Sequence, residues 1–202
     1  MTDSLVVFLH GVGSNGASLA PLGRLWAEAL PDTAFASPDG AFPFDQGGDG
    51  RQWFSVSGVT PANRGERIVA ARPALEAVLA DLIAEHGLSN QLDRVALVGF
   101  SQGAIMALDI VVSGRLPVGA VVGFAGRLAS PQPWSPSATP VLLVHGSDDA
   151  MIPAWEGQAA AASLREVGTQ VEWFPVEGGR HEVHPAGAAA AGRFLARVFG
   201  TP

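Results

Sequence analysis

The residues around Ser101 combine the types and the spacing that nucleophilic catalysis needs. Gly99, Phe100, Ser101, Gln102 and Gly103 spell G-x-S-x-G between an apolar run and a stretch with helical spacing. In a tight turn from a strand into a helix, such a serine takes a strained conformation that exposes its hydroxyl oxygen, and the glycines avoid collisions with both elements. The pattern predicts Ser101 as a nucleophile. The alternative is a serine that caps a helix in an ordinary turn, which would need neither glycine.

A serine hydroxyl is a weak nucleophile at neutral pH, so it requires a base, and the base requires an orienting acid. With this motif, the acid and then the histidine follow the serine along the chain. Asp149 and its neighbour Asp148 follow one apolar run, and His181 follows the last one. We therefore expect Ser101, Asp149 and His181 to meet, with Asp148 as the alternative acid.

Three further histidines are alternatives for the base or have structural roles. His10 and His145 end apolar runs, and we expect both to bond loop backbone. His184 lies just before Pro185 and is the rival base, or an exposed residue in the first turn of a helix. Two glycines precede His181 and permit a loop that reaches back over a sheet, which favours His181.

The elements that must position these residues alternate along the chain. Apolar runs predict six buried strands, at residues 5–10, 33–37, 94–100, 119–124, 141–145 and 170–174. Helical spacing predicts helices at residues 22–30, 67–85, 102–112, 155–167 and 185–199. This alternation predicts an α/β fold with a mainly parallel sheet and helices on both faces, so that ligands bind beyond the carboxyl ends of the strands. Residues 38–64 and 127–140 are expected to be long loops.

Composition limits the classes of protein to which the chain can belong. Its 202 residues predict one domain over 1–202, and 48% hydrophobic against 15% charged residues predicts a packed core. The absence of cysteine excludes disulfides, thiolate metal sites and cysteine nucleophiles. A net charge of −7, with scattered arginines and no lysine, argues against nucleic acid binding.

The chain also lacks the usual signals for membrane insertion or export. The N-terminal stretch is too short and too uncharged for a signal peptide, and no apolar stretch reaches the length of a membrane span. We expect a cytoplasmic protein without stable membrane insertion, either a monomer or a homodimer.

Five segments together make the chain resemble the phospholipase/carboxylesterase family of small α/β-hydrolases, which includes the acyl-protein thioesterases. They are LHGVGSNG at 9–16, RQWF at 51–54, GFSQG at 99–103, HGSDDAMIP at 145–153 and GGRH at 178–181. The resemblance implies a serine carboxylesterase that forms an acyl-enzyme and needs no metal or organic cofactor. The implied substrates are small or acyl-chain carboxylic esters, with thioesters and lysophospholipids as further possibilities.

The resemblance also implies roles for individual residues. It selects Asp149 as the acid and His181 as the base, and it assigns an oxyanion hole to the backbone N–H groups of Val12 and Gln102. It further implies a sheet of six strands in spatial order 2-1-3-4-5-6. Two neighbours are unusual, since Asp148 adds a second carboxylate beside the acid and Arg180 adds a cation beside the base, where it would tune the base's proton affinity.

The apolar residues in the expected active-edge loops are candidates for the substrate pocket. Trp53 and Met151 are the preferred substrate-binding residues. The weaker candidates, some of which must pack the loops, are Phe54, Trp134, Ile152 and Trp155.

Two hypotheses from other functional classes are the alternatives to ester hydrolysis. Residues 11–16 spell G-x-G-x-x-G after the first apolar run, and Asp39 follows at the distance of a ribose-binding acid, as in dinucleotide-binding proteins. The expected helix begins later than that motif requires, however, and Asp39 lies in a Pro-Asp-Gly turn. The other alternative is a hydrolase fold that binds ligands without catalysis, against which the complete set of serine, acid and histidine argues.

Overall fold

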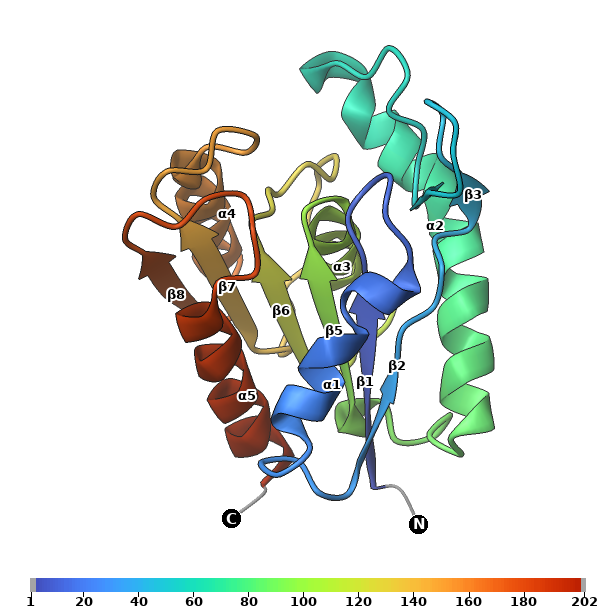
Figure 1. Cartoon of the computed structure of the whole chain (residues 1–202), viewed down its shortest axis with the longest axis vertical. Coiled ribbons are helices and arrows are strands. Elements are labelled where there is room, and N and C mark those ends of the chain that lie inside the picture. The colour runs from blue at the N-terminus through green and yellow to red at the C-terminus, as the bar shows by residue number, and fades with distance from the viewer. Residues whose placement is uncertain (1–2, 201–202) are drawn as a thin grey trace.

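A six-stranded parallel sheet forms the centre of the computed structural model (Figure 1). The structure describes residues 3–200, so the first two and the last two residues of the expected 1–202 domain lie outside the described residues. The strands are β1 (Ser4–Leu9), β2 (Thr33–Ala36), β5 (Val95–Phe100), β6 (Ala120–Phe124), β7 (Val141–Gly146) and β8 (Val171–Val176). They lie in the order β2-β1-β5-β6-β7-β8, and every neighbouring pair is parallel. Counted along the chain, this is 2-1-3-4-5-6, so the predicted sheet is confirmed.

The five predicted α-helices are present, with bounds that differ at some ends. They are α1 (Ala20–Trp26), α2 (Pro61–Glu85), α3 (Gln102–Ser113), α4 (Ala154–Glu166) and α5 (Pro185–Phe199), with short 3₁₀ turns η1 (Gly16–Ser18) and η2 (Leu92–Arg94). Helix α2 begins six residues before the prediction. Thr60 caps it, because the Asn63 N–H donates to Thr60 Oγ1 (3.3 Å) and the Thr60 N–H donates to Asn63 Oδ1 (2.8 Å), while Pro61 suits the first helical position.

The sheet is covered on both faces, as predicted. Along β1, Leu5, Val7 and Leu9 pack into the core layer that α2, α3 and α4 cover, whereas Val6 and Phe8 pack into the layer covered by α1 and α5. A strand with both faces buried is apolar throughout, which explains the unbroken apolar runs in the sequence. In the part of the chain described, none of the helices is both long enough and apolar enough to span a bilayer.

The expected loop over residues 38–64 contains a small hairpin. Strands β3 (Phe42–Pro43) and β4 (Arg51–Gln52) pair antiparallel, and Arg51 also bridges to Ser14 in the loop after β1. The Gly13 N–H donates to Arg51 O (2.9 Å) and the Arg51 N–H donates to Ser14 O (2.7 Å). The hairpin therefore holds the loop that carries Val12.

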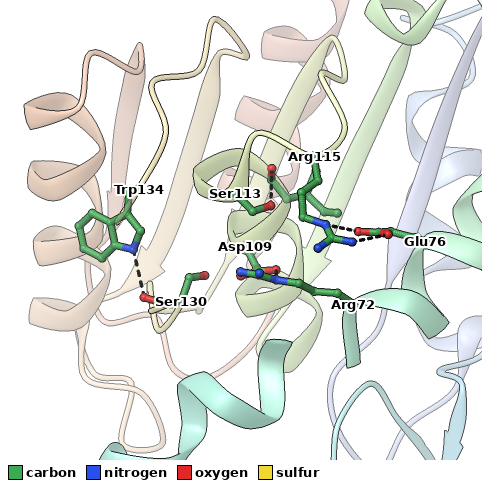
Figure 2. Close-up of polar contacts among 8 residues, drawn as sticks. Arg72, Glu76, Asp109, Ser113, Arg115, Ser130 and Trp134 are labelled. Atoms are coloured by element: carbon green, nitrogen blue, oxygen red, sulfur yellow. Dashed lines mark hydrogen bonds and ion pairs between the residues drawn. The ribbon is translucent and has the colours of Figure 1, made fainter. Parts of the chain in front are cut away.

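Two ion pairs connect α2 to α3 and to the residues after α3 (Figure 2). Arg72 Nε and Nη2 donate to the two carboxylate oxygens of Asp109, each at 2.8 Å, and only 1% of the Asp109 side chain is exposed. A buried carboxylate needs such a partner because an unpaired charge there would be costly. Arg115 pairs in the same forked way with Glu76 nearer the surface.

Candidate active site

The turn between β5 and α3 gives Ser101 a strained backbone. Its φ is 52° and its ψ is −113°, which non-glycine residues rarely adopt. The flanking glycines are required by close contacts. A Cβ on Gly99 would lie 2.4 Å from the Ala104 nitrogen in α3, and a Cβ on Gly103 would lie 1.9 Å from Leu9 O in β1. This agrees with the steric reason that the sequence suggested.

Gly103→Ala is expected to lower the free energy of unfolding by about 2 kcal/mol or more, because the added methyl group has no room beside Leu9 O. Gly65→Ala in α2 is the matched control, since a Cβ there would come no closer than 3.5 Å to its nearest neighbour, Ala129 O, and alanine favours helix by up to about 1 kcal/mol. Urea denaturation measures both values. Equal effects of the two substitutions would contradict this steric account.

The structure brings Ser101, His181 and Asp149 into one hydrogen-bonded chain. Ser101 Oγ lies 3.0 Å from His181 Nε2, and His181 Nδ1 lies 2.7 Å from Asp149 Oδ2. Because an ionised carboxylate only accepts, Nδ1 carries the proton and Nε2 is left free to accept from the serine hydroxyl. The three residues follow β5, β7 and β8, so they meet at the carboxyl edge of the sheet as expected.

Asp149 is buried but surrounded by donors. Its Oδ1 accepts from the backbone N–H groups of Met151 and Ile152, both at 2.8 Å, and its Oδ2 lies 3.3 Å from His145 Nε2 in addition to His181. Burial alone opposes ionisation, but the hydrogen bonds from His181, Ile152 and Met151 outweigh it and lower the pKa of Asp149. The carboxylate is therefore charged at neutral pH and held in one orientation.

The residues that the sequence offers as alternatives to His181 and Asp149 have other partners in the structure. His184 caps α5, where its Nδ1 accepts from the Ala186 N–H (3.2 Å), and Asp148 Oδ1 accepts from Ser147 Oγ (2.9 Å). The side chain of Arg180 is exposed. Only Asp149 and His181 of the sequence candidates reach Ser101 as a connected pair.

His10 and His145 bond loop backbone, as expected. His10 Nδ1 donates to Gly11 O (2.7 Å), its Nε2 accepts from the Gly40 N–H (2.8 Å), and burial lowers its pKa, which keeps it neutral. His145 Nε2 donates to Ile152 O (2.7 Å). The contact of His145 with Asp149 was not expected from the sequence.

The backbone N–H groups of Val12 and Gln102 are available at the same edge. Within residues 3–200, neither group donates to another protein group. Gln102 is the first residue of α3, so its N–H points out of the helix N-terminus, where the helix dipole favours negative charge.

The side chain of Gln102 fixes the neighbouring loop, which the sequence did not reveal. Its Oε1 accepts from the Trp53 N–H (2.7 Å) and its Nε2 donates to Phe54 O (2.8 Å). The Trp53 indole N–H donates to His10 O (2.9 Å), and the residue is 1% exposed. Trp53 therefore lies in the interior and supports the loops, instead of lining an open surface as its sequence position suggested.

Asp45 holds the segment that follows β4. Its carboxylate accepts from Gln52 Nε2, Ser55 Oγ and the N–H groups of Val56 and Ser57, at 2.7 to 3.0 Å. These bonds, led by that of Gln52, lower the pKa of Asp45 to about 2. No local pattern in the sequence predicts this cluster.

Asp45→Asn is expected to lower the Tm at pH 7, because an amide cannot accept all four bonds. A carboxylate whose pKa is lowered on folding stabilises the folded state at pH values above its unfolded pKa, near 3.8. That contribution is lost as the pH falls through the folded pKa of about 2. The Tm difference from wild type should therefore shrink between pH 5 and about pH 2. Asp49→Asn, an exposed carboxylate in the same hairpin loop, is the control. A difference that stays constant with pH would contradict the assignment.

Two exposed apolar side chains follow Asp149 within six residues of the chain. Met151 is 71% exposed and Trp155 is 66% exposed, whereas Phe54 and Ile152 are buried. Trp134 is half-buried, and its indole N–H donates to Ser130 O (3.0 Å) (Figure 2). A separate cavity of about 370 Å³ lies between the β3–β4 hairpin and α2 and has a mainly apolar lining that includes Phe42, Phe54 and Ala71.

The G-x-G-x-x-G motif has a packing role. The Gly16 N–H donates to Asp39 Oδ1 (2.9 Å), and a Cβ on Gly16 would lie 1.9 Å from Ser37 O. The motif ends in the three-residue 3₁₀ turn η1 and helix α1 starts only at Ala20, so the motif does not present the N-terminus of an α-helix to a pyrophosphate. The dinucleotide-binding alternative is therefore not supported.

Several known proteins with similar sequences or structures are named esterases or carboxylesterases. The family model described as phospholipase/carboxylesterase matches residues 2–199. Esterase YpfH of Escherichia coli (strain K12) is 34% identical over 181 residues, which cover 90% of this chain and 77% of that protein. Carboxylesterase SOBER1 of Arabidopsis thaliana is 26% identical over 198 residues, covering 91% of this chain and 85% of that protein.

The crystal structure of esterase PE8 superposes with a TM-score of 0.89 at 34% identity, and the match covers 98% of this chain and 93% of that one. The fold, the strand-to-helix turn that carries Ser101 and the family model agree with one another. This chain therefore belongs to the phospholipase/carboxylesterase family, a family of carboxylic ester hydrolases with the α/β-hydrolase fold.

Proposed function

We propose that the chain, acting as one domain, hydrolyses small carboxylic esters through Ser101, His181 and Asp149. The observation that carries the proposal is the hydrogen-bonded chain from Ser101 Oγ to His181 (3.0 Å) and on to Asp149 (2.7 Å). His181 Nε2 takes the hydroxyl proton as Oγ attacks the acyl carbonyl, while Asp149 stabilises the imidazolium. His181 then gives the proton to the leaving alkoxide, which leaves an acyl-enzyme.

Water completes the cycle by the same steps. His181 takes a proton from the attacking water, the carboxylic acid departs, and Ser101 Oγ recovers its proton. The tetrahedral oxyanion of each half-reaction would accept hydrogen bonds from the Val12 and Gln102 N–H groups, and one such donor contributes about 3 kcal/mol. Because both donors are backbone groups, side-chain substitutions at these two positions would leave them in place.

Met151 is our proposed contact for the acyl group. Its side chain is exposed, and its backbone N–H donates to the carboxylate of Asp149. Trp53 is assigned a supporting role, because its side chain is buried. Thioesters and lysophospholipids present the same acyl carbonyl, so the chemistry proposed here would extend to them.

A graded panel of substrates tests the proposed function. It consists of p-nitrophenyl esters of increasing acyl length, one acyl thioester and one lysophospholipid, each measured against Ser101→Ala as the blank. Turnover of at least the short esters by wild type and not by the variant supports the proposal. No turnover of any ester above the blank contradicts it and would favour a hydrolase fold used only for binding.

A further inference from the structure

His145, near the carboxyl end of β7, contacts both the Asp149 carboxylate and the loop that holds it. Its Nε2 donates to Ile152 O (2.7 Å) and lies 3.3 Å from Asp149 Oδ2, and only 1% of its side chain is exposed. Asp149 Oδ2 is the same oxygen that accepts from His181 Nδ1, at 2.7 Å. Two imidazoles therefore approach one carboxylate oxygen, His181 as its hydrogen-bond donor and His145 as a close polar neighbour.

The tautomer of His145 follows from these contacts. The carbonyl oxygen of Ile152 and the ionised carboxylate of Asp149 can only accept hydrogen bonds, so Nε2 of His145 carries a proton. The nitrogen that lies beside Oδ2 is therefore an N–H group, and no nitrogen lone pair faces the carboxylate there.

Ile152 connects His145 to Asp149 a second time. The Ile152 N–H donates to Asp149 Oδ1 (2.8 Å), while the Ile152 carbonyl oxygen accepts from His145. Within residues 3–200, no other group donates to Ile152 O. A buried carbonyl group without a donor is costly, so loss of the His145 N–H would favour movement of Ile152 toward another partner. That movement would also disturb the donor to Asp149 Oδ1.

The ring of His145 is itself held in place by α4 and β8. It packs against the ring of Trp173 in β8, with centroids 6.1 Å apart, and a Cβ on Gly157 in α4 would lie 2.4 Å from His145 Nδ1. The imidazole therefore occupies a space that α4 leaves open because residue 157 is a glycine.

We propose that His145 is a positioning residue for the acid. Its N–H keeps Ile152 and the Asp149 carboxylate in the arrangement in which that carboxylate stabilises the His181 imidazolium. This inference rests on the proposed function. Because His145 acts through Asp149, its contribution belongs to the transition state and should appear in kcat, with KM unchanged.

Two substitutions separate hydrogen-bond donation from packing. His145→Phe keeps an aromatic ring of similar size beside Gly157 and Trp173 but has no N–H group, whereas His145→Gln loses the ring and keeps an amide nitrogen that can donate near the place of Nε2. We expect His145→Phe to lower kcat for ester hydrolysis by about tenfold. His145→Gln should stay within about threefold of wild type, even if its Tm is the lower of the two. A ring that served only for packing would reverse this order of activities.

Thr139→Val is the control for a buried hydrogen bond lost at the other end of β7. Thr139 Oγ1 donates to Val118 O (2.8 Å) just before the strand begins, and the residue is 5% exposed. We expect a lower Tm and a kcat within about twofold of wild type. A loss of kcat as large as that of His145→Phe would show that destabilisation of β7 is sufficient, and would overturn the inference.

His145→Phe with the kcat of wild type, or His145→Gln with a lower kcat than His145→Phe, would also overturn it. If only one of the two variants folds, that variant decides, because wild-type kcat in His145→Phe or less than about a tenth of it in His145→Gln contradicts the proposal. If neither folds, NMR of wild type decides. The His145 Nε2–H proton should then be protected from exchange with solvent, and a rapidly exchanging proton would contradict the bond to Ile152. Absence of ester hydrolysis by wild type would instead refute the proposed function.

Discussion

Ser101→Ala is expected to lower kcat for ester hydrolysis by about 10⁶-fold, which is the scale of loss when a serine hydrolase loses its nucleophile. The reason is chemical, since the hydroxyl 3.0 Å from His181 Nε2 is the atom proposed to attack the carbonyl. Steady-state kinetics with the best ester of the panel measures the loss. A variant that keeps more than about a tenth of wild-type kcat would show that another group attacks the ester.

Two controls belong with this variant. Ser113→Ala removes a hydroxyl at the opposite end of α3, where it donates to Ile110 O, and should leave kcat unchanged (Figure 2). Ser101→Gly should lose as much activity as Ser101→Ala. It should also raise the free energy of unfolding by about 1 kcal/mol, because glycine adopts a φ of 52° without strain. A Ser101→Gly protein less stable than Ser101→Ala would contradict the strain at this turn.

Asp149→Asn is expected to lower kcat by about 10⁴-fold. The Asp149 carboxylate accepts from His181 at one oxygen and from two backbone N–H groups at the other. An asparagine has only one oxygen, so its NH₂ group must face one of these donors, and the imidazole loses its fixed tautomer. The loss should lie mainly in kcat.

Asp148→Asn is the matched control, because it changes the adjacent carboxylate, which bonds Ser147 Oγ and not the imidazole chain. We expect its kcat to stay within about twofold of wild type, the scale of a surface substitution. Asp149→Asn within tenfold of wild type, or Asp148→Asn as severe as Asp149→Asn, would show that the acid is assigned wrongly.

The parts of the fold that the sequence predicts are those governed by local pattern. The turn at Ser101 is predicted because two glycines, a strand and a helix are contiguous in the chain. The four central strands β1, β5, β6 and β7 are predicted because they are buried and therefore mainly apolar, whereas the order of the strands follows from the family resemblance. Helix α2 was predicted too short because its first buried apolar residue is Ile68, whereas its cap lies at Thr60. Strands β3 and β4 have two residues each and are too short for a periodic signal.

The parts of the site that the sequence does not predict depend on distant partners. Gln102 bonds residues 53 and 54, and Asp45 bonds residues 52, 55, 56 and 57, across loops with no regular spacing. The location of Trp53 follows from such bonds, so a tryptophan in a polar loop proved to be interior. Spacing alone also left Asp148 and Asp149 open, since their distinction lies in which side chain turns toward His181.

The central claim is that Ser101 is the nucleophile, and covalent labelling tests it most directly. Wild type treated with a fluorophosphonate should gain the mass of one adduct, peptide mapping should locate that adduct on Ser101, and ester turnover should stop in proportion to labelling. The Ser101→Ala protein should gain no adduct. An adduct on any other residue, or ester turnover that persists in fully labelled protein, would contradict the claim.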